Sequence, residues 1–256
     1  MIHVGLLAAM PEELGQIIKN LENLRSKNYG DLEIFTGEWT NELNTKILIS
    51  VAWSGWGKVS AARATTRLIS NSASEHKVNF MIFTGVAGAV DLNLKQWDIV
   101  ISEAVIQHDF DARPLYEKYV IPSLKQEKIY PRGEILDNFY SILIKSFKNK
   151  KDQQFGSIYK GLIATGDMFI SDKNKLKQLS LEIPKVLAVE MEGASFAQVA
   201  HQEKIDWIII RVISDGADDN AHDEFKSFLK KYKQKSWDLI KHLLNSKNFC
   251  TQIINY

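Results

Sequence analysis

Four acidic side chains stand where apolar, strand-like segments of the sequence end. Glu13 follows the segment 3–9, Glu190 and Glu192 close the stretch VLAVEME, and Asp215 follows DWIIIRVIS. The carboxyl ends of parallel strands share one edge of a sheet, so we expect these carboxylates to converge there. Two carboxylates in different protonation states can cleave a glycosidic bond, one as the acid for the leaving group and one as the base for water. The spacing therefore favours an acid–base site.

Each of these residues also has a purely structural explanation. Glu190 and Glu192 could open a helix, where acidic groups interact favourably with the free N–H groups of the first turn. Asp215 could cap a turn or the next helix. Alternatively, burial behind its apolar strand would raise the pKa of Asp215 and let it donate a proton. Arg211 lies inside that strand, so it needs either a buried ion-pair partner or a polar pocket.

Strands and helices alternate along the chain. The apolar pattern predicts strands at 3–9, 32–39, 45–53, 80–90, 97–106, 161–171, 186–190 and 206–214, with a small-residue loop beginning at Thr84. Helical patterns cover 11–24, 57–71, 134–147, a segment from about Met191, and a long C-terminal stretch through Lys241. The irregular segment 107–134 is typical of a functional or disordered loop. No linker divides the chain, so we expect one α/β domain over residues 1–256.

The charge balance argues against a nucleic acid or an anionic membrane as partner. Lys and Arg total 32 and Asp and Glu total 31, which gives a formal net charge of +1. The lysine-rich run KSFLKKYKQKSWDLIKH carries apolar residues at helical spacing, which indicates a helix with one buried stripe and a solvated basic face. These stripe residues are Phe228, Leu229, Trp237 and Ile240.

The single cysteine, Cys250, can form neither an internal disulfide nor a thiolate zinc cluster, which favours an intracellular protein. The N-terminal apolar run lacks a basic leader, and no apolar segment is long enough to cross a membrane. We therefore expect a cytoplasmic protein. The stretches HDFD (108–111) and DDNAHDE (218–224) contain metal-compatible side chains without paired-ligand spacing, so we expect no metal.

Six short segments together carry a family resemblance. In order and spacing, GLLAAMPEEL, SGWGKVSAA, TGVAGAV, GDMFIS, VEMEGASFA and RVISDGAD resemble the 5′-methylthioadenosine/S-adenosylhomocysteine nucleosidases of the nucleoside phosphorylase superfamily. The resemblance runs from about Val4 to Phe225. It implies a three-layer α/β/α fold with a twisted mixed central sheet, and a homodimer. It also implies cofactor-free hydrolysis of the bond between adenine and a 5′-thio-substituted ribose.

The resemblance also assigns roles to single residues. Glu13 matches the base that activates water, and Asp215 matches the acid that protonates N7 of adenine. Glu192 matches the residue that binds the ribose hydroxyls, and Glu190 is interpreted as a support. The remaining matches concern substrate contacts and the groups that orient the carboxylates. They are the Met191 backbone beside the ribose, Phe169 stacked on adenine, the Ile170 backbone at the adenine edge, Gly88 beside the substrate, and Arg211 and Ser214 behind the carboxylates.

Several positions depart from the family pattern, and they concern mainly the 5′ substituent. Val86 stands where many members carry serine, and Trp56 stands at a usually smaller aliphatic position. The chain is shorter than the pattern before Phe225, and no aromatic residue matches the one that closes over the 5′ tail. Ala112 and Leu115 fall in the long loop that reaches the neighbouring subunit in the family.

Three other functions fit the sequence less well than hydrolysis. A purine nucleoside phosphorylase needs polar groups for phosphate, whereas this chain offers Phe83 and Val86 at the corresponding loop and no arginine after the first strand until Arg25. An AMP nucleosidase needs cations for a 5′-phosphate, and Arg113 is the only good candidate. A non-catalytic nucleoside-binding protein would need no acid–base pair.

Overall fold

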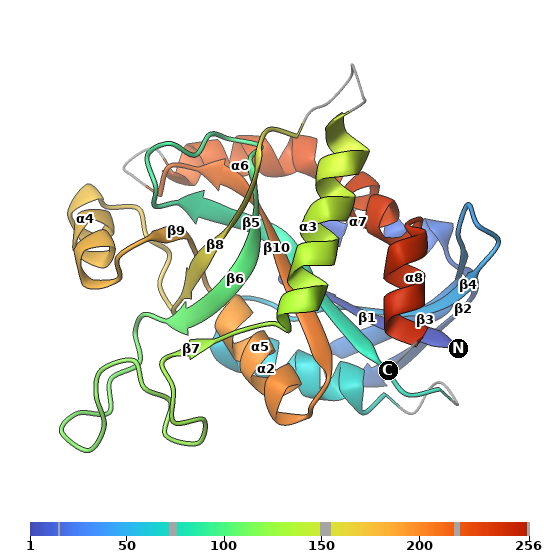
Figure 1. Ribbon diagram of the computed structural model, residues 1–256, viewed down its shortest axis with the longest axis horizontal. Helices are drawn as coiled ribbons and strands as arrows, with labels where there is room; N and C mark the ends of the chain where they lie inside the picture. Colours follow the sequence, from blue (N-terminus) through green and yellow to red (C-terminus); the bar gives the residue numbers. More distant parts are fainter. Residues whose placement is uncertain (15, 72–75, 149–154, 218–220, 255–256) are drawn as a thin grey trace.

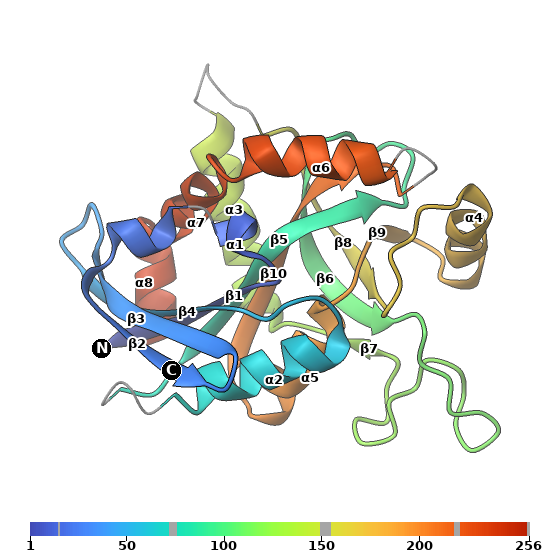
Figure 2. The ribbon, with the colours of Figure 1, turned by 180° about the vertical axis from the view of Figure 1, so that it is seen from behind.

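A mixed sheet forms the centre of the molecule and has helices on both faces (Figures 1 and 2). The computed structural model describes residues 1–14, 16–71, 76–148, 155–217 and 221–254. This arrangement confirms the expected three-layer α/β/α fold. Within the described residues the sheet has ten strands, which are β1 Ile2–Ala8, β2 Glu22–Tyr29, β3 Leu32–Thr40, β4 Lys46–Trp53, β5 Phe80–Ala89, β6 Ile99–Gln107, β7 Lys128–Ile129, β8 Ile158–Thr165, β9 Val186–Glu190 and β10 Asp206–Asp215.

The long strand β5 organises the sheet. β10 runs parallel to β5 along its length, from the pair Phe80–Asp206 to the pair Gly88–Asp215. β1 flanks the first half of β5 in parallel, and β9 flanks its last residues in antiparallel. The pairings β5–β10, β10–β6, β6–β8, β8–β9 and β9–β5 therefore close a circuit, while β4, β3 and β2 extend the sheet beyond β1. The carboxyl ends of β1 and β10 consequently lie at one edge.

The helices divide between the two faces of the sheet. α2 (Lys58–Ile69) and α5 (Gly193–Gln202) pack against each other on one face, where Ala61, Ala64, Ala194, Ala197 and Ala200 are buried. Such small side chains let the two helices approach closely. The other face carries α1 (Pro11–Leu14), α3 (Gly133–Lys148), α6 (Ala221–Tyr232), α7 (Ser236–Leu244) and α8 (Lys247–Ile254) (Figure 1). α4 (Lys173–Glu182) lies outside these layers, beside β8 and β9.

The expected helix over residues 11–24 is wrong beyond Leu14. Pro11 begins a helix as predicted, but that helix ends at Leu14, a 3-10 turn follows at Ile17–Asn20, and β2 begins at Glu22. β2 is an edge strand whose residues are almost all exposed and polar. Its conformation depends on backbone pairing with β3, so its side chains carry no burial pattern that could have revealed it.

Two further boundaries differ from the prediction. The C-terminal stretch is broken, because α6 ends at Tyr232 and α7 begins at Ser236, although Phe228, Trp237 and Ile240 are buried as predicted. The expected small-residue loop after Thr84 is strand, because backbone pairing with β10 continues to Gly88. Among the helices of the described residues, none is long and apolar enough to cross a membrane.

Candidate active site

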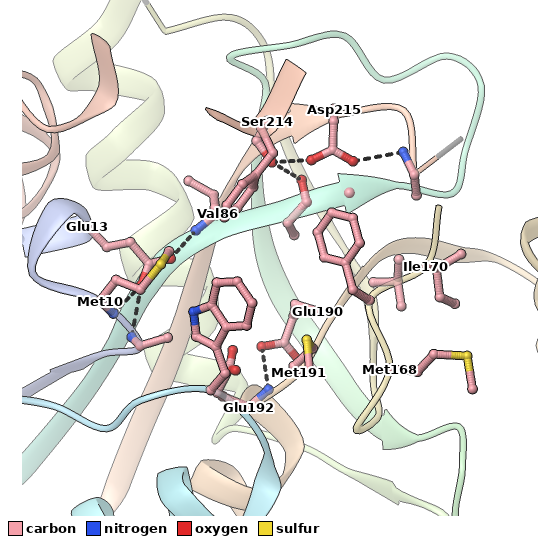
Figure 3. Close-up of a pocket in the computed structure, with 18 residues that line it drawn as sticks. Met10, Glu13, Val86, Met168, Ile170, Glu190, Met191, Glu192, Ser214 and Asp215 are labelled. Atoms are coloured by element: carbon pink, nitrogen blue, oxygen red, sulfur yellow. Dashed lines mark hydrogen bonds between the residues drawn. The ribbon is translucent and has the colours of Figure 1, made fainter. Parts of the chain in front are cut away.

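A pocket opens at the edge where β1, β5 and β10 end, and the predicted carboxylates line it (Figure 3). Its walls come from the β1–α1 turn, the loop before α2, the end of β5, the loop after β8, the β9–α5 junction and the end of β10. The lining residues are Ala9, Met10, Glu13, Trp56, Val86, Ala87, Gly88, Met168, Phe169, Ile170, Val189, Glu190, Met191, Glu192, Ser214, Asp215, Ala217 and Phe225. Of the predicted site residues, only Arg211 lies behind this lining.

The carboxylates converge, although not all by the route that the sequence suggested. Glu13 follows β1 and Asp215 is the last residue of β10, and both strands run parallel to β5, as expected. β9 instead runs antiparallel to β5, with Val189 opposite Gly88. The chain therefore brings Glu190 and Glu192 to the pocket from the opposite direction.

Backbone N–H groups hold the Glu13 carboxylate. Its Oε2 atom accepts hydrogen bonds from the N–H groups of Ala9 (2.8 Å) and Met10 (2.9 Å), and Oε1 accepts one from Val86 (2.9 Å). The residue is only 2% exposed, and this burial raises the pKa of Glu13 above its usual value. A carboxylate with a raised pKa is a better proton acceptor near neutral pH than a free one.

A single buried arginine lies among three glutamates. The guanidinium of Arg211 donates a hydrogen bond to Glu190, and its Nη2 atom lies 3.6 Å from Oε2 of Glu192. Its Nη1 atom lies 3.9 Å from Oε1 of Glu13. The guanidinium also lies over the ring of Phe83, 4.2 Å from the centroid. Arg211 therefore has both the ion pairs and the adjoining pocket that the sequence left as alternatives.

Burial and the adjacent Glu190 raise the pKa of Glu192 to about 8. One cation does not compensate three buried carboxylates, so one of them is expected to hold a proton near neutral pH. The site is thus poor in positive charge despite the presence of Arg211.

The two glutamates of the VEMEG stretch have different structural roles. Glu190 accepts hydrogen bonds from the N–H groups of Glu192 (3.1 Å) and Gly193 (2.8 Å) and from the hydroxyl of Thr165. It therefore stabilises the start of α5, as the structural explanation required. Glu192 stands at the N-cap position of α5 without a side-chain capping bond. Instead, its Oε1 atom accepts the N–H of Gly57 at 2.9 Å.

Asp215 has hydrogen-bond partners that suit both of its protonation states. Its Oδ1 atom accepts the N–H of Ala217 (2.9 Å), so it does cap a turn. Its Oδ2 atom lies 2.6 Å from the hydroxyl of Ser214, and that hydroxyl lies 3.3 Å from the carbonyl of Ala87. Ser214 can donate to an ionised Asp215, or donate to Ala87 and accept from a protonated Asp215. Asp215, Ser214 and the carbonyl of Ala87 therefore keep hydrogen-bond partners when Asp215 is protonated.

The backbone of Gly88 lies so close to Asp215 and Ala217 that a side chain at position 88 would collide with them. A Cβ atom at this position would lie 2.8 Å from Cβ of Ala217 and 3.1 Å from Oδ1 of Asp215. The missing side chain thus keeps the approach to Asp215 open.

Aromatic rings line another part of the pocket. The ring of Phe225 makes edge contacts with Phe169, at a centroid distance of 5.8 Å, and with Trp56, at 6.4 Å. Phe225 lines the pocket although it was not among the predicted site residues. Phe225 lies one helical turn before Phe228 and Leu229, and this spacing could have indicated that they share one helix face.

The expected position of Phe83 beside the pocket is wrong. Phe83 is fully buried and stacks on Phe196, so of the two apolar residues named in the phosphorylase comparison only Val86 lines the pocket.

Ala112 and Leu115 lie away from the pocket, on the segment between β6 and β7 that projects from the body (Figure 1). Of the DDNAHDE stretch, residues 218–220 lie outside the described residues. Within the described part, no group of three His, Cys, Asp or Glu could hold a metal ion.

Known proteins of one family resemble this chain over nearly its whole length. The family model of the phosphorylase superfamily matches residues 3–245. A 5′-methylthioadenosine/S-adenosylhomocysteine nucleosidase of Haemophilus influenzae is 33% identical over 244 residues, which cover 94% of this chain and 98% of the relative.

Solved structures of similar proteins superpose well on this chain. A nucleosidase of the same name from Neisseria meningitidis, in complex with methylthio-immucillin-A, has a TM-score of 0.83 at 28% identity and covers 96% of this chain and 99% of its own. The futalosine hydrolase of Helicobacter pylori has a TM-score of 0.81 at 28% identity, covering 95% and 97%. Sequence and fold together show that this chain belongs to the phosphorylase superfamily and, within it, to the 5′-methylthioadenosine/S-adenosylhomocysteine nucleosidase family.

Proposed function

We propose that this protein hydrolyses the N-glycosidic bond of 5′-methylthioadenosine, S-adenosylhomocysteine or a related 5′-substituted adenosine. The products are adenine and the free 5′-substituted ribose. One observation carries the proposal: two buried carboxylates with different hydrogen-bond partners, Glu13 and Asp215, face a single pocket (Figure 3). Such a pair supplies the base and the acid that glycosidic hydrolysis needs.

In the proposed reaction, Glu13 accepts a proton from the water that attacks the anomeric carbon. The bond between that carbon and adenine breaks, its electron pair moves to adenine, and Asp215 donates a proton to N7. The N–H groups on Glu13 orient its carboxylate, while Ser214 can pair with Asp215 before and after the transfer. Both carboxylates remain in place throughout, which reduces reorganisation during the reaction.

The remaining residues of the pocket bind the substrate. Glu192 accepts hydrogen bonds from the ribose hydroxyls beside the Met191 backbone, and the positive charge that develops on the sugar favours its ionised form. Phe169 stacks on adenine, the Ile170 backbone contacts its edge, and Gly88 leaves room beside it. Arg211 and Ser214 orient the carboxylates.

The 5′ substituent is expected to lie against Met10, Trp56 and Phe225, since the other walls serve the adenine and the ribose. These side chains are apolar and suit a thioether.

The charge of the pocket favours water over phosphate as the attacking group. Among the described residues that line it, none is Lys, Arg or His. Arg211 lies behind the lining and is already surrounded by Glu13, Glu190 and Glu192. Phosphate would therefore meet carboxylates and the apolar side chain of Val86, without charge-assisted hydrogen bonds to offset its desolvation.

Two other functions receive less support. An AMP nucleosidase would need a cation at the 5′ end, and Arg113 is paired with Asp111 on the projecting segment. A nucleoside-binding protein without activity would not need the acid–base pair Glu13 and Asp215.

The sugar product decides between hydrolysis and phosphorolysis. We expect the purified protein to release adenine from methylthioadenosine in phosphate-free buffer and to form the free reducing thioribose. Added phosphate should neither accelerate adenine release nor yield a sugar 1-phosphate. A sugar 1-phosphate peak that grows with phosphate concentration would instead support a phosphorylase.

We also propose that residues 1–256 form one domain that acts as a cytoplasmic homodimer without a cofactor. The projecting segment supports the dimer, because Leu115 is 84% exposed and Tyr116 45% exposed there. Exposed apolar side chains grouped on one segment are typical of an interface. Light scattering on wild type and on Leu115→Asp tests this proposal, since the substitution should shift the mass from dimer toward monomer.

A further inference from the structure

Two loops that line the pocket meet at the start of α2. One is the loop before α2, in which Gly57 donates its N–H to Glu192. The other is the loop after β8, which begins at Gly166 and carries Asp167, Phe169 and Ile170. The N–H of Lys58, the residue after Gly57, donates to Oδ1 of Asp167 at 2.7 Å. The N–H groups of two consecutive residues therefore bind Glu192 and the β8 loop.

A second contact closes this connection. The N–H of Asp167 donates to Oδ2 of Asp109 at 2.8 Å, and the ammonium group of Lys58 donates to Oδ1 of Asp109 at 2.6 Å. Lys58 thus binds Asp167 through its backbone and Asp109 through its side chain. The three residues form a closed ring of hydrogen bonds at the pocket rim, which we call the rim network.

The packing at Gly57 makes this arrangement specific. Gly57 has a φ of +92°, which side chains rarely tolerate, and a Cβ atom there would lie 2.9 Å from Oδ1 of Asp167. Asp167 therefore packs directly against Gly57, the residue whose N–H binds Glu192. A shift of Asp167 would therefore move Gly57 and weaken the hydrogen bond from Gly57 to Glu192.

We infer that Asp167, held by Asp109 and Lys58, is a positioning residue that couples the purine side of the pocket to the ribose side. Asp167 belongs to the loop that carries Phe169 and Ile170, and it also binds the N–H of Lys58, the residue after the glycine whose N–H binds Glu192. The inference rests on the proposed function, because it takes adenine and ribose as the two ligand halves. It concerns a residue that lines neither half.

The test uses two readouts, one for each side. The first is the Kd of adenine, measured by calorimetry. The second is the ratio of kcat/KM for methylthioadenosine to that for its 2′-deoxy analogue. Asp167→Ala should raise the adenine Kd about threefold or more, as expected for loss of a capping interaction. It should also lower the ribose-to-deoxyribose ratio at least about twofold, because Glu192 is less well placed. Asp167→Asn, which keeps an acceptor oxygen for Lys58, should restore both readouts.

Asp172→Ala is the matched control. Like Asp167, which accepts one backbone N–H at the start of α2, Asp172 accepts backbone N–H groups at a helix start, in its case two at the start of α4. Neither of these two bonds leads to Glu192. Loss of Asp172 should lower stability by a similar amount and leave both readouts unchanged. The inference is overturned if Asp167→Ala changes neither readout or only one, or if Asp172→Ala changes both equally. Failure of the wild type to release adenine from any adenosine derivative would instead overturn the proposed function, and the inference with it.

Discussion

The carboxylate of Glu13 approaches the guanidinium of Arg211 to 3.9 Å without forming a hydrogen bond to it. The hydrogen bonds of Glu13 come instead from the backbone of Ala9, Met10 and Val86. Arg211 favours the ionised form of Glu13, but burial has the larger effect, so the pKa of Glu13 is raised. A hydrogen bond from Arg211 to Glu13 would have favoured the ionised form further and made Glu13 a weaker base.

Glu13→Gln should lower turnover on methylthioadenosine by at least about 100-fold, the lower range for a positioned base. The amide would also place an NH₂ group toward a backbone N–H that now donates to Glu13, so some loss of stability is expected. Steady-state kinetics and thermal unfolding are measured together. Near-normal turnover of the folded variant would show that Glu13 is not the base.

Asp215→Asn should leave the fold nearly unchanged while abolishing the acid. The amide oxygen can still accept the N–H of Ala217, and the NH₂ group can donate to Ser214, which in turn donates to Ala87. We expect turnover to fall at least about 100-fold, with substrate binding reduced far less. Single-turnover kinetics separate the two effects. If substrate affinity fell while the single-turnover rate constant stayed unchanged, Asp215 would be assigned to substrate binding alone.

Glu192→Gln should affect ribose substrates more than 2′-deoxyribose substrates. A 2′-deoxy analogue of methylthioadenosine already lacks one of the two hydroxyl groups proposed to bind Glu192, so it has less to lose. The comparison uses kcat/KM for both substrates with wild type and variant. Equal losses on both substrates would point to a structural role, through the N–H of Gly57 or through Arg211.

Much of this site was accessible from the sequence because its carboxylates end apolar segments. Buried strands are recognised by their composition, and the residue that follows such a strand is necessarily near the sheet edge. Glu13 and Asp215 follow this rule. The hydrogen-bond partners of these two carboxylates could not be predicted from the sequence. They include the backbone N–H groups of Ala9, Met10 and Ala217, and the side chain of a residue does not indicate where its backbone N–H will point.

The errors have a common physical origin in tertiary contacts. β2 has an exposed polar sequence, and only pairing with β3 makes it a strand. Thr84–Gly88 has the composition of a small-residue loop, but β10 pairs with it. The direction of β9 decides how Glu190 and Glu192 reach the pocket, and direction is not encoded in any single segment. Phe83 was expected at the pocket from its position in the loop that corresponds to the phosphate site of a phosphorylase, but its side chain stacks on Phe196 of α5.

A buried histidine far from the pocket should make stability depend on pH. His3 is fully buried in β1, and burial lowers its pKa below the usual value of 6.5. Its Nδ1 atom bonds to the carbonyl of His76 (2.7 Å), so Nδ1 carries the proton and Nε2 accepts from Ser50 (2.8 Å). Ser50 in turn lies 2.8 Å from the hydroxyl of Thr36. Protonation at Nε2 would break this directional chain, and it would add charge near His76 and Arg25.

The sign of the pH effect follows from proton binding. Between pH 6.5 and the lower pKa of folded His3, the unfolded chain binds more protons than the folded one, so the contribution of His3 to stability is lost as the pH falls through this window. The raised pKa values of Glu13 and Glu192 act in the opposite direction, so the measurement must be a difference. We therefore compare urea unfolding of wild type and His3→Gln from pH 8 to pH 5.

His3→Gln should be less stable than wild type at pH 8, because the buried hydrogen bonds are disturbed, and this deficit should shrink as the pH falls below 6.5. For one proton the difference can change by at most about 1.4 kcal/mol per pH unit. His201→Gln, which changes an exposed histidine on α5, serves as the control and should leave the pH profile parallel to that of wild type. A deficit of His3→Gln that stays constant from pH 8 to pH 5 would show that the folded protein does not exclude a proton from His3.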